Sequence, residues 1–171
     1  MAQNVEIKAR LRDRPRVIEA LQELNATGPT ELRQVDVFFL TPAGRLKLRT
    51  INDTVAELIY YDRPDATGPK TSDYVVVPVP DPHLLRQALA RAVGEGATVK
   101  KVRTLYLVGP TRVHLDVVEG LGDFLELEVV LDAPDQAETG QRIADDLLRR
   151  FGIDTADLIS GAYVDLSATM P

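Results

Sequence analysis

Hydrophobic and polar residues alternate with a period of two along eight stretches of the chain, which is typical of β-strands with one apolar and one polar face. These stretches cover approximately residues 4–12, 33–40, 44–50, 55–63, 74–79, 99–108, 111–119 and 123–131. Turn-forming pairs such as Gly109-Pro110 separate neighbouring stretches, which favours antiparallel hairpins. The pattern therefore predicts an eight-stranded, mostly antiparallel sheet or closed barrel.

Three other segments have the apolar spacing of amphipathic helices. The first follows Asp13, the second begins at Asp81-Pro82, and the third covers about 135–151 and ends at Gly152. Aspartate is a favoured N-cap, proline is tolerated in the first turn, and glycine commonly ends a helix. A short helical turn is expected near 155–160. The long polar segment 64–72 is rich in turn formers and is expected to be a mobile loop.

Charged residues are unusually frequent on the polar side of the predicted strands. In the first stretch, Glu6, Lys8 and Arg10 alternate with Val5 and Ile7. An open sheet with a solvated charged face would explain this pattern. A closed barrel would also explain it, with the apolar face outward under the helices and the charged face lining the interior. The apolar stripes of three helices need an apolar surface to cover, so an α+β fold with helices packed outside a barrel is favoured.

In such a barrel the interior would hold more cations than carboxylates. The cations are Lys8, Arg10, Lys47, Arg49, Arg63, Lys101, Arg103 and Arg112, and the carboxylates are Glu6, Glu57, Asp116, Glu126 and Glu128. Guanidinium and ammonium groups bind phosphate oxygens, and clustered carboxylates suit a hard divalent cation. This combination predicts chemistry on a polyphosphate chain with a bound metal ion.

Composition narrows the class of protein further. The 171 residues have 44% hydrophobic content and a net charge of −6, which fits one soluble domain over residues 1–171 and disfavours nucleic-acid and anionic membrane partners. No apolar run is long enough to span a bilayer. The absence of cysteine excludes disulfides and thiolate metal sites and fits the cytoplasm. With only two histidines, a zinc site built from several histidines is not expected.

The ordered series of motifs resembles the CYTH family, also called the triphosphate tunnel metalloenzymes, which includes class IV adenylate cyclases and thiamine triphosphatases. The matching segments are Asn4-Val5-Glu6-Ile7-Lys8, Gln34-Val35-Asp36-Val37-Phe38-Phe39, Gly44-Arg45-Leu46-Lys47-Leu48-Arg49, Lys101-Val102-Arg103, Arg112-Val113-His114-Leu115-Asp116, Phe124-Leu125-Glu126-Leu127-Glu128 and Ser160-Gly161-Ala162-Tyr163-Val164-Asp165-Leu166. The resemblance covers nearly the whole chain and implies an eight-stranded antiparallel tunnel with outer helices.

The resemblance also implies roles for the charged residues. The triphosphate would be held by Lys8, Arg10, Lys47, Arg49, Arg63, Lys101, Arg103 and Arg112, with Lys70 closing from the long loop. Among these cations, Lys8, Lys101 and Arg103 are the candidates for catalysis. Mg²⁺ or Mn²⁺ would be bound by Glu6, Asp116, Glu126 and Glu128. His114 and Glu57 are candidate acid–base groups; the simpler interpretations are hydrogen bonding among acids for His114 and pairing with an arginine for Glu57.

One position departs from the family pattern, because Asn4 stands where the family usually has its first glutamate. An amide oxygen can bind a metal but carries no charge, so we expect weaker affinity at one metal position, or one metal where relatives hold two. Cyclisation of ATP to cyclic AMP and pyrophosphate is expected from the cyclase-like branch. Hydrolysis of tripolyphosphate, a nucleoside triphosphate or thiamine triphosphate is the alternative, and non-catalytic polyphosphate or nucleotide binding is a third hypothesis. A homodimer is the default expectation for an assembly.

Overall fold

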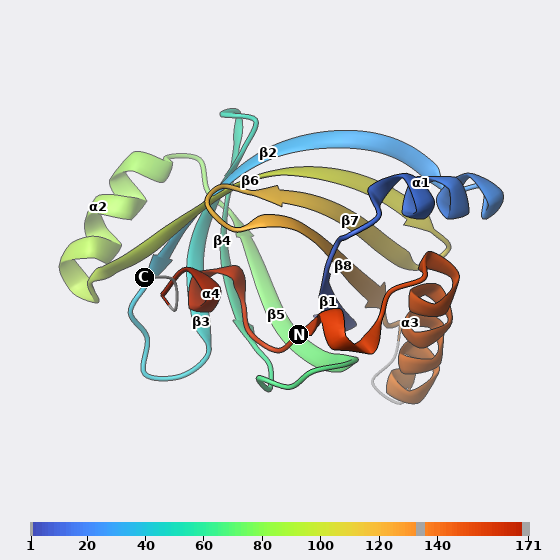
Figure 1. The fold of residues 1–171 in the computed structure, drawn as a ribbon. Helices are drawn as coiled ribbons and strands as arrows, with labels where there is room; N and C mark the ends of the chain where they lie inside the picture. Colours follow the sequence, from blue (N-terminus) through green and yellow to red (C-terminus); the bar gives the residue numbers. More distant parts are fainter. Residues whose placement is uncertain (1, 133–135, 169–171) are drawn as a thin grey trace.

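A closed antiparallel β-barrel forms the body of the molecule (Figure 1). The structure is a computed structural model that describes residues 2–132 and 136–168. The strands are β1 (Ala2–Arg10), β2 (Thr27–Phe39), β3 (Arg45–Ile51), β4 (Val55–Asp62), β5 (Lys70–Pro78), β6 (Glu95–Val108), β7 (Thr111–Val118) and β8 (Gly122–Val130). They follow the order β5-β4-β3-β2-β6-β7-β8-β1, and pairing of β1 with β5 closes the barrel. The predicted eight-stranded antiparallel barrel is confirmed.

The seam of the barrel lies along β1. One edge of this strand pairs with β8 from Asn4 to Arg10. The other edge is shared, because Ala2 to Glu6 pair with β5, whereas Lys8 and Ala9 pair with the two-residue strand β9 (Leu158–Ile159). The N-terminal strand is therefore hydrogen-bonded on both sides along most of its length, and the C-terminal part of the chain completes its second edge.

The helices begin and end where the sequence predicts. They are α1 (Arg14–Glu23), α2 (Pro82–Ala92) and α3 (Ala137–Phe151), and the backbone N–H groups of the first turns of α1 and α2 donate to Asp13 and Asp81. Gly152 ends α3 with a φ of 66°, in the left-handed region that favours glycine. The turn expected near 155–160 is a 3-10 helix (Thr155–Asp157) followed by β9. A fourth helix, α4 (Tyr163–Ala168), was not predicted.

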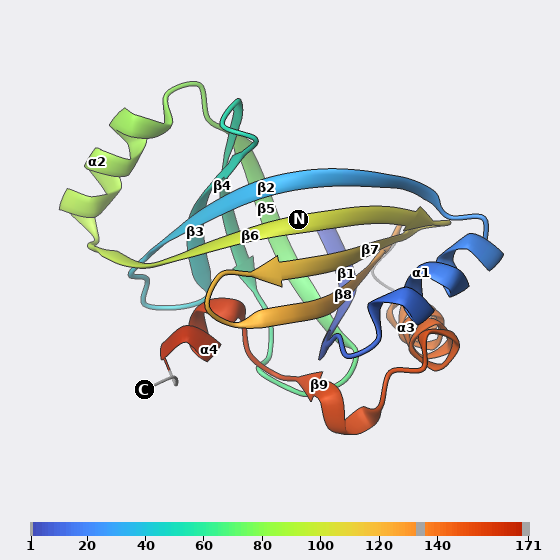
Figure 2. The ribbon, with the colours of Figure 1, turned by 45° about the horizontal axis from the view of Figure 1, so that its top comes forward.

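The apolar core lies outside the barrel wall, between the strands and the helices. Helices α1 and α3 cover one side of the barrel and α2 covers another (Figure 2). Under α1 and α3, fully buried side chains such as Ile7, Leu115 and Leu127 point outward from β1, β7 and β8. Burial of one such side chain stabilises the fold by about 1.5–3 kcal/mol. The alternate side chains of the same strands therefore face the barrel interior, as the closed-barrel interpretation expects.

Several strands are longer than the pattern predicts. β2 begins at Thr27, β6 at Glu95 and β5 at Lys70, each several residues before the expected start. The first residues of β5 belong to the segment expected to be a loop, but they pair with β1, with Lys70 opposite Glu6. Hydrogen bonds to a neighbouring strand override weak local patterning. None of the helices in the described residues is long and apolar enough to cross a membrane.

Candidate functional site

The barrel interior encloses a polar cavity of about 460 Å³, within the size range of ligand sites. Seven cations and five carboxylates line it. One end of the barrel carries the β7–β8 turn, and the opposite end carries the β6–β7 turn. Of the residues expected in the site, those that line the cavity are Glu6, Lys8, Lys47, Arg49, Glu57, Arg63, Lys101, Arg103, Arg112, His114, Glu126 and Glu128.

Three of the expected residues lie elsewhere. Asp116 is completely buried behind Arg103. Arg10 is exposed outside the cavity, with its guanidinium 5.4 Å from the ring centroid of Phe124. Lys70 is buried, and its Nζ donates to the backbone oxygens of Ala66 and Ser160 at 2.9 Å each. In this conformation Lys70 joins two segments of the chain to each other.

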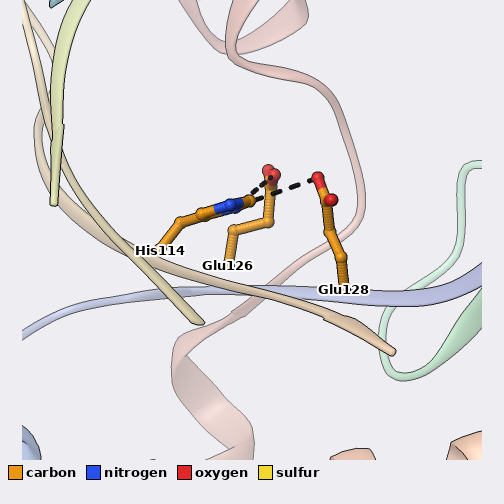
Figure 3. A group of neighbouring side chains, drawn as sticks. All are labelled: His114, Glu126 and Glu128. Carbon is orange, nitrogen blue, oxygen red and sulfur yellow. Dashed lines mark ion pairs between the residues drawn. The ribbon is translucent and has the colours of Figure 1, made fainter. Parts of the chain in front are cut away.

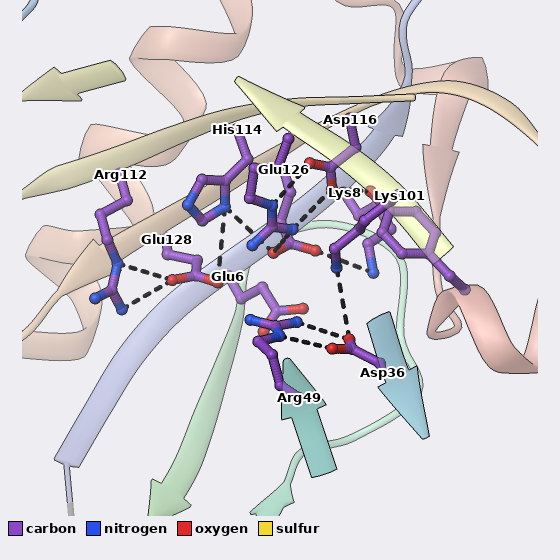
Figure 4. A network of polar contacts seen from close by, with 12 residues as sticks. Glu6, Lys8, Asp36, Arg49, Lys101, Arg112, His114, Asp116, Glu126 and Glu128 are labelled. Carbon is purple, nitrogen blue, oxygen red and sulfur yellow. Dashed lines mark hydrogen bonds and ion pairs between the residues drawn. The ribbon is translucent and has the colours of Figure 1, made fainter. Parts of the chain in front are cut away.

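Asp36 organises the cations on one wall of the cavity, as Figure 4 shows. Its two oxygens accept hydrogen bonds from Nε and Nη2 of Arg49, at 2.7 Å each, and Oδ2 accepts another from Lys47 at 3.0 Å. Lys101 Nζ lies 3.7 Å from the same oxygen. Burial alone would raise the pKa of Asp36, but Arg49, Lys47 and Lys101 hold it well below its usual range. This carboxylate is therefore ionised and fixes three cations in place.

Burial and neighbouring cations lower the pKa values of the lysines on this wall. Burial, with a further contribution from Arg49, lowers the pKa of Lys47 to about 8. Burial, followed by Arg103 and Arg49, lowers the pKa of Lys101 well below its usual range. An anionic ligand in the cavity would favour the charged forms of both lysines. The protein alone therefore disfavours the charged forms of these two lysines, and a bound polyanion would restore them.

A second charge network surrounds Arg103. Its Nε and Nη2 donate to the two oxygens of Asp116 at 2.7 Å each, and Nη2 also reaches Glu126 Oε1 at 3.1 Å. Asp116 accepts a further bond at 2.7 Å from the Tyr163 hydroxyl. Burial would raise the pKa of Asp116, yet Arg103 lowers it to about 2. Both Asp116 oxygens are thus occupied by protein donors, so this residue orients Arg103 rather than facing the cavity.

His114, Glu126 and Glu128 form a compact group of potential metal ligands near the β6–β7 end (Figure 3). His114 Nδ1 lies 3.4 Å from Glu126 Oε1 and 3.8 Å from Glu128 Oε1, and one ligand atom from each residue lies within 4.8 Å of the others. Burial, followed by Arg103, lowers the pKa of His114, which favours the neutral imidazole that can bind a metal. Glu6 lies directly opposite Glu128 on the β1–β8 ladder.

The residues at this end fit a divalent cation. Asn4 lines the cavity and is buried, and its Oδ1 has no hydrogen-bond partner among the described residues. A buried carbonyl oxygen without a partner is costly unless a ligand satisfies it. Oxygen ligands together with one imidazole suit Mn²⁺ and, through the carboxylates, Mg²⁺. Burial, followed by the neighbouring charge of Glu126, raises the pKa of Glu6, and a cation would relieve that repulsion.

Arg63 presents unused donors to the cavity. Its Nη1 lies 2.9 Å from Glu6 Oε1, but within the described residues Nε and Nη1 make no hydrogen bond of good geometry. By contrast, Arg112 donates to Glu128 from Nε at 2.9 Å. Glu57 lies opposite Arg49 on the β3–β4 ladder, but the Arg49 guanidinium binds Asp36 rather than Glu57. Among the arginines that line the cavity, Arg63 is thus the one whose N–H groups are most available to an anion.

Sequence reasoning assigned no role to two residues that the structure places in the site. Asp36 shares the inward face of β2 with Gln34 and Phe38, so the period-two pattern could have placed it in the interior. Tyr163 lies more than thirty residues after β8, and its ring contacts Lys8 and Lys101. No local pattern indicates that contact, because it depends on the path of the C-terminal segment.

The fold and sequence are similar to proteins of one family. The model of the CYTH domain matches residues 2–163. The chain is 30% identical to the adenylate cyclase CyaB of Aeromonas hydrophila, covering 93% of this chain and 85% of that protein. It is 25% identical to a putative adenylate cyclase of Methanocaldococcus jannaschii, covering 95% and 97%.

Among solved structures, a protein of Pyrococcus horikoshii superimposes on this chain with a TM-score of 0.84 and 27% sequence identity. The match covers 95% of this chain and 98% of that one. The similarity therefore extends over the whole barrel, including the strands that line the cavity. Because the family model spans nearly all of the chain, the protein is a member of the CYTH domain family.

Proposed function

We propose that the protein is a divalent-cation-dependent enzyme that converts ATP to cyclic AMP and pyrophosphate. The observation that carries the proposal is that one cavity holds both a set of cations fixed around Asp36 and a compact group of potential metal ligands. Lys47, Arg49 and Lys101 gather around Asp36. The His114, Glu126 and Glu128 group lies towards the β6–β7 end, and its carboxylates are contacted by Lys8, Arg103 and Arg112. The adenylate cyclase names of the two relatives support this choice among triphosphate reactions.

The cations around Asp36, together with Arg103, would hold the β- and γ-phosphates. Arg49 and Arg103 are each fixed by a bidentate carboxylate, Asp36 and Asp116 respectively. Their positions are therefore set before the ligand arrives, which lowers the ordering cost of binding. Arg63, whose Nη1 lies 2.9 Å from Glu6 Oε1, adds N–H groups without good hydrogen bonds among the described residues. Guanidinium forks and ammonium groups together match the oxygens of a pyrophosphate unit.

The α-phosphate would then lie beside His114, Glu126 and Glu128. A divalent cation bound there would neutralise phosphate oxygens and so favour attack on the phosphorus. Leu105 pairs with His114 across the β6–β7 ladder, and both residues line the cavity. Leu32 lines the same region from β2. This apolar surface suits a ribose and base rather than another phosphate, so the proposal favours a nucleoside triphosphate.

The reaction needs positioning more than covalent participation of the protein. The ribose 3′-oxygen forms a bond to the α-phosphorus, the bond from that phosphorus to the bridging oxygen of the β-phosphate breaks, and the hydroxyl proton is released. The negative charge that develops on the leaving pyrophosphate faces Lys8, Lys101 and Arg103, which would stabilise it. Holding the 3′-oxygen in line with the breaking bond supplies much of the remaining acceleration.

The test is product analysis after incubation with ATP and Mn²⁺ or Mg²⁺, and separately with inorganic tripolyphosphate. We expect cyclic AMP and pyrophosphate in equal amounts from ATP. Release of orthophosphate without cyclic AMP would contradict the cyclase and identify a triphosphatase. Tight binding of both compounds without turnover would contradict catalysis and identify a polyphosphate- or nucleotide-binding protein.

Two variants connect any activity to this cavity. Glu128→Gln removes one charge from the acidic group at nearly unchanged size and is expected to reduce turnover at least about a hundredfold. Glu95→Gln is the matched control, because Glu95 pairs with Arg86 on the surface and does not line the cavity. If both variants lost turnover equally, or if neither lost it, the reaction would not take place at the proposed site.

A further inference from the structure

Gln34 is a neutral polar side chain among the charged groups of the barrel interior. It is 4% exposed and lines the cavity from the inward face of β2, between Leu32 and Asp36. On that face Asp36 fixes the cations already described, and Leu32 contributes to the apolar surface. Gln34 therefore lies where the lining of the cavity changes from cationic to apolar.

The side-chain oxygen of Gln34 has no hydrogen-bond donor within the described residues. Two long cations lie close by, because Arg49 on β3 and Arg103 on β6 are diagonal neighbours of Gln34 across the two flanking ladders. Their guanidinium groups are directed elsewhere, to Asp36 and to Asp116 (Figure 4). A buried acceptor that the nearby donors bypass is costly unless a group in the cavity donates to it.

The chemistry of this position selects the kind of group that can donate to it. Ionised phosphate oxygens only accept hydrogen bonds, so they would not satisfy an amide oxygen. A divalent cation is disfavoured beside Arg49 and Arg103, and the compact group of potential metal ligands lies on β7 and β8 instead. A neutral hydroxyl or amino group of an organic ligand meets both conditions. In a nucleoside triphosphate, the hydroxyls nearest the α-phosphate belong to the ribose.

We propose that Gln34 positions the ribose 3′-hydroxyl of ATP by accepting a hydrogen bond from it. The inference rests on the proposed function, in which the 3′-oxygen attacks the α-phosphorus. With the phosphates among the cations around Asp36 and the base against Leu32, the ribose between them lies beside Gln34. The amide does not remove the proton. It fixes the direction of the O–H bond, which leaves a lone pair of the 3′-oxygen free for the phosphorus, and the proton is released as that bond forms and pyrophosphate leaves.

Calorimetric titration with three ligands, at fixed pH and Mn²⁺ concentration, tests the contact without turnover. The ligand α,β-methylene-ATP has the 3′-hydroxyl, but its methylene bridge cannot be cleaved. The other two, 3′-deoxy-ATP and inorganic tripolyphosphate, lack that hydroxyl. Gln34→Met removes the amide oxygen at nearly unchanged length. We expect this variant to bind α,β-methylene-ATP about fivefold more weakly than the wild type does, as for the loss of one hydrogen bond. Its dissociation constants for the other two ligands should stay within about twofold of the wild-type values.

Turnover separates positioning from binding. With ATP, Gln34→Met should lower kcat for cyclic AMP at least about tenfold and raise KM no more than about fivefold, because a misaligned nucleophile affects the reacting geometry more than the affinity.

Gln87→Met is the matched control. It makes the same substitution on the exposed surface of α2, outside the cavity, and should leave binding and turnover unchanged. Thermal unfolding checks the fold, and removal of a buried acceptor without a partner should not destabilise the protein. If Gln34→Met does not fold, Gln34→Leu removes the same oxygen, and the same pattern is expected for it.

The outcomes separate the two proposals. A wild type that makes no cyclic AMP from ATP would contradict the proposed function and, with it, the positioning role of Gln34. If the wild type makes cyclic AMP but a folded Gln34→Met or Gln34→Leu protein binds all three ligands equally more weakly, the amide contacts the phosphates, and the positioning role alone is overturned. An equal loss for α,β-methylene-ATP and 3′-deoxy-ATP would assign the amide to the 2′-hydroxyl or the base and would also overturn it. Unchanged binding of α,β-methylene-ATP, an unchanged kcat, or the same losses in Gln87→Met would do so as well.

Discussion

Asp36 binds Arg49 through both carboxylate oxygens, with Nε and Nη2 of the guanidinium each 2.7 Å away. The same carboxylate lies 3.0 Å from Lys47 Nζ and 3.7 Å from Lys101 Nζ. One buried negative charge therefore balances part of the charge of three cations. Such an arrangement costs desolvation free energy, which close pairing offsets only while every partner is present.

Asp36→Asn should destabilise the protein, because it leaves buried cations without their nearest negative charge. We expect the free energy of unfolding to fall by about 3–5 kcal/mol, the range for breaking a buried ion pair on one side. Urea denaturation would measure the change. Asp62→Asn is the control, since Asp62 is exposed at the end of β4 and should change stability by less than about 0.5 kcal/mol. Similar values for the two variants would show that Asp36 is not a structural centre.

Triphosphate binding should weaken as the pH rises through about 8. Burial and Arg49 lower the pKa of Lys47 to about 8, so the free protein loses this positive charge above that pH. Binding a polyanion then requires the protein to take up a proton. For one linked proton, the dissociation constant increases about tenfold per pH unit above the pKa. Calorimetry with tripolyphosphate between about pH 6.5 and 9.5 would measure it.

Lys47→Arg separates this effect from the titration of the ligand itself. Arginine stays charged over the whole range, so the variant should lack the part of the alkaline loss that comes from Lys47. The ratio of the two dissociation constants at each pH cancels the ionisation of tripolyphosphate, and also that of Lys70, whose pKa is likewise lowered to about 8, chiefly by burial. A ratio that does not vary with pH would contradict the assignment to Lys47.

Asn4→Glu should make the protein more dependent on a divalent cation. The new carboxylate would be buried beside Glu6 and Glu128, so the metal-free variant should unfold at a lower temperature than the wild type. Mn²⁺ should then raise its unfolding temperature more than that of the wild type. Tenfold tighter binding corresponds to about 1.4 kcal/mol of extra stabilisation at saturating metal. Asn4→Gln, which adds length without charge, should show no larger Mn²⁺ effect than the wild type, and equal shifts in both variants would refute the prediction.

Gly140→Ala should destabilise the contact between α3 and the barrel. A β-carbon at position 140 would lie 2.8 Å from a methyl carbon of Leu131 and 2.8 Å from a methyl carbon of Val5. Alanine favours helix by about 1 kcal/mol over glycine, but overpacking in a core costs about 1–3 kcal/mol, so we expect a net loss. Chemical denaturation would measure it. Gln141→Ala, on the exposed side of α3, should not destabilise the protein, and a stabilised Gly140→Ala would show that α3 can shift outward.

The barrel could be predicted because alternation, turn residues and helix caps all agree. On β1, for example, Ile7 belongs to the core outside the barrel and the neighbouring Lys8 lines the cavity. Asp13, Asp81 and Gly152 also mark helix ends through local hydrogen bonding or backbone conformation. Such features depend on a few adjacent residues, so they can be interpreted without the rest of the chain.

The partners within the site could not be predicted in the same way. Alternation indicates that Asp116 and Glu126 face inward, but not that Asp116 binds Arg103 with both oxygens. Arg10 alternates with the apolar residues of β1 just as Lys8 does, yet it lies outside the cavity, because the strand extends past it. The position of Tyr163 depends on contacts far away in the sequence. The alternation along a strand predicts which face of the sheet a residue occupies. Its position along the barrel axis and its contact partners are set by the tilt and stagger of the strands.

The seam of the barrel has a consequence for how the chain reaches its native state. Asn4 pairs with Val130, and Ala9 pairs with Leu158. Both edges of β1 can therefore be paired only after nearly the whole polypeptide has been made. Contacts so distant in sequence slow folding, because chain entropy is lost before they form. During synthesis on the ribosome, the N-terminal strand would be an open edge able to pair with other chains. Charged residues along this strand, such as Glu6 and Lys8, disfavour that pairing, so the side chains proposed to bind substrate also protect the nascent protein from aggregation.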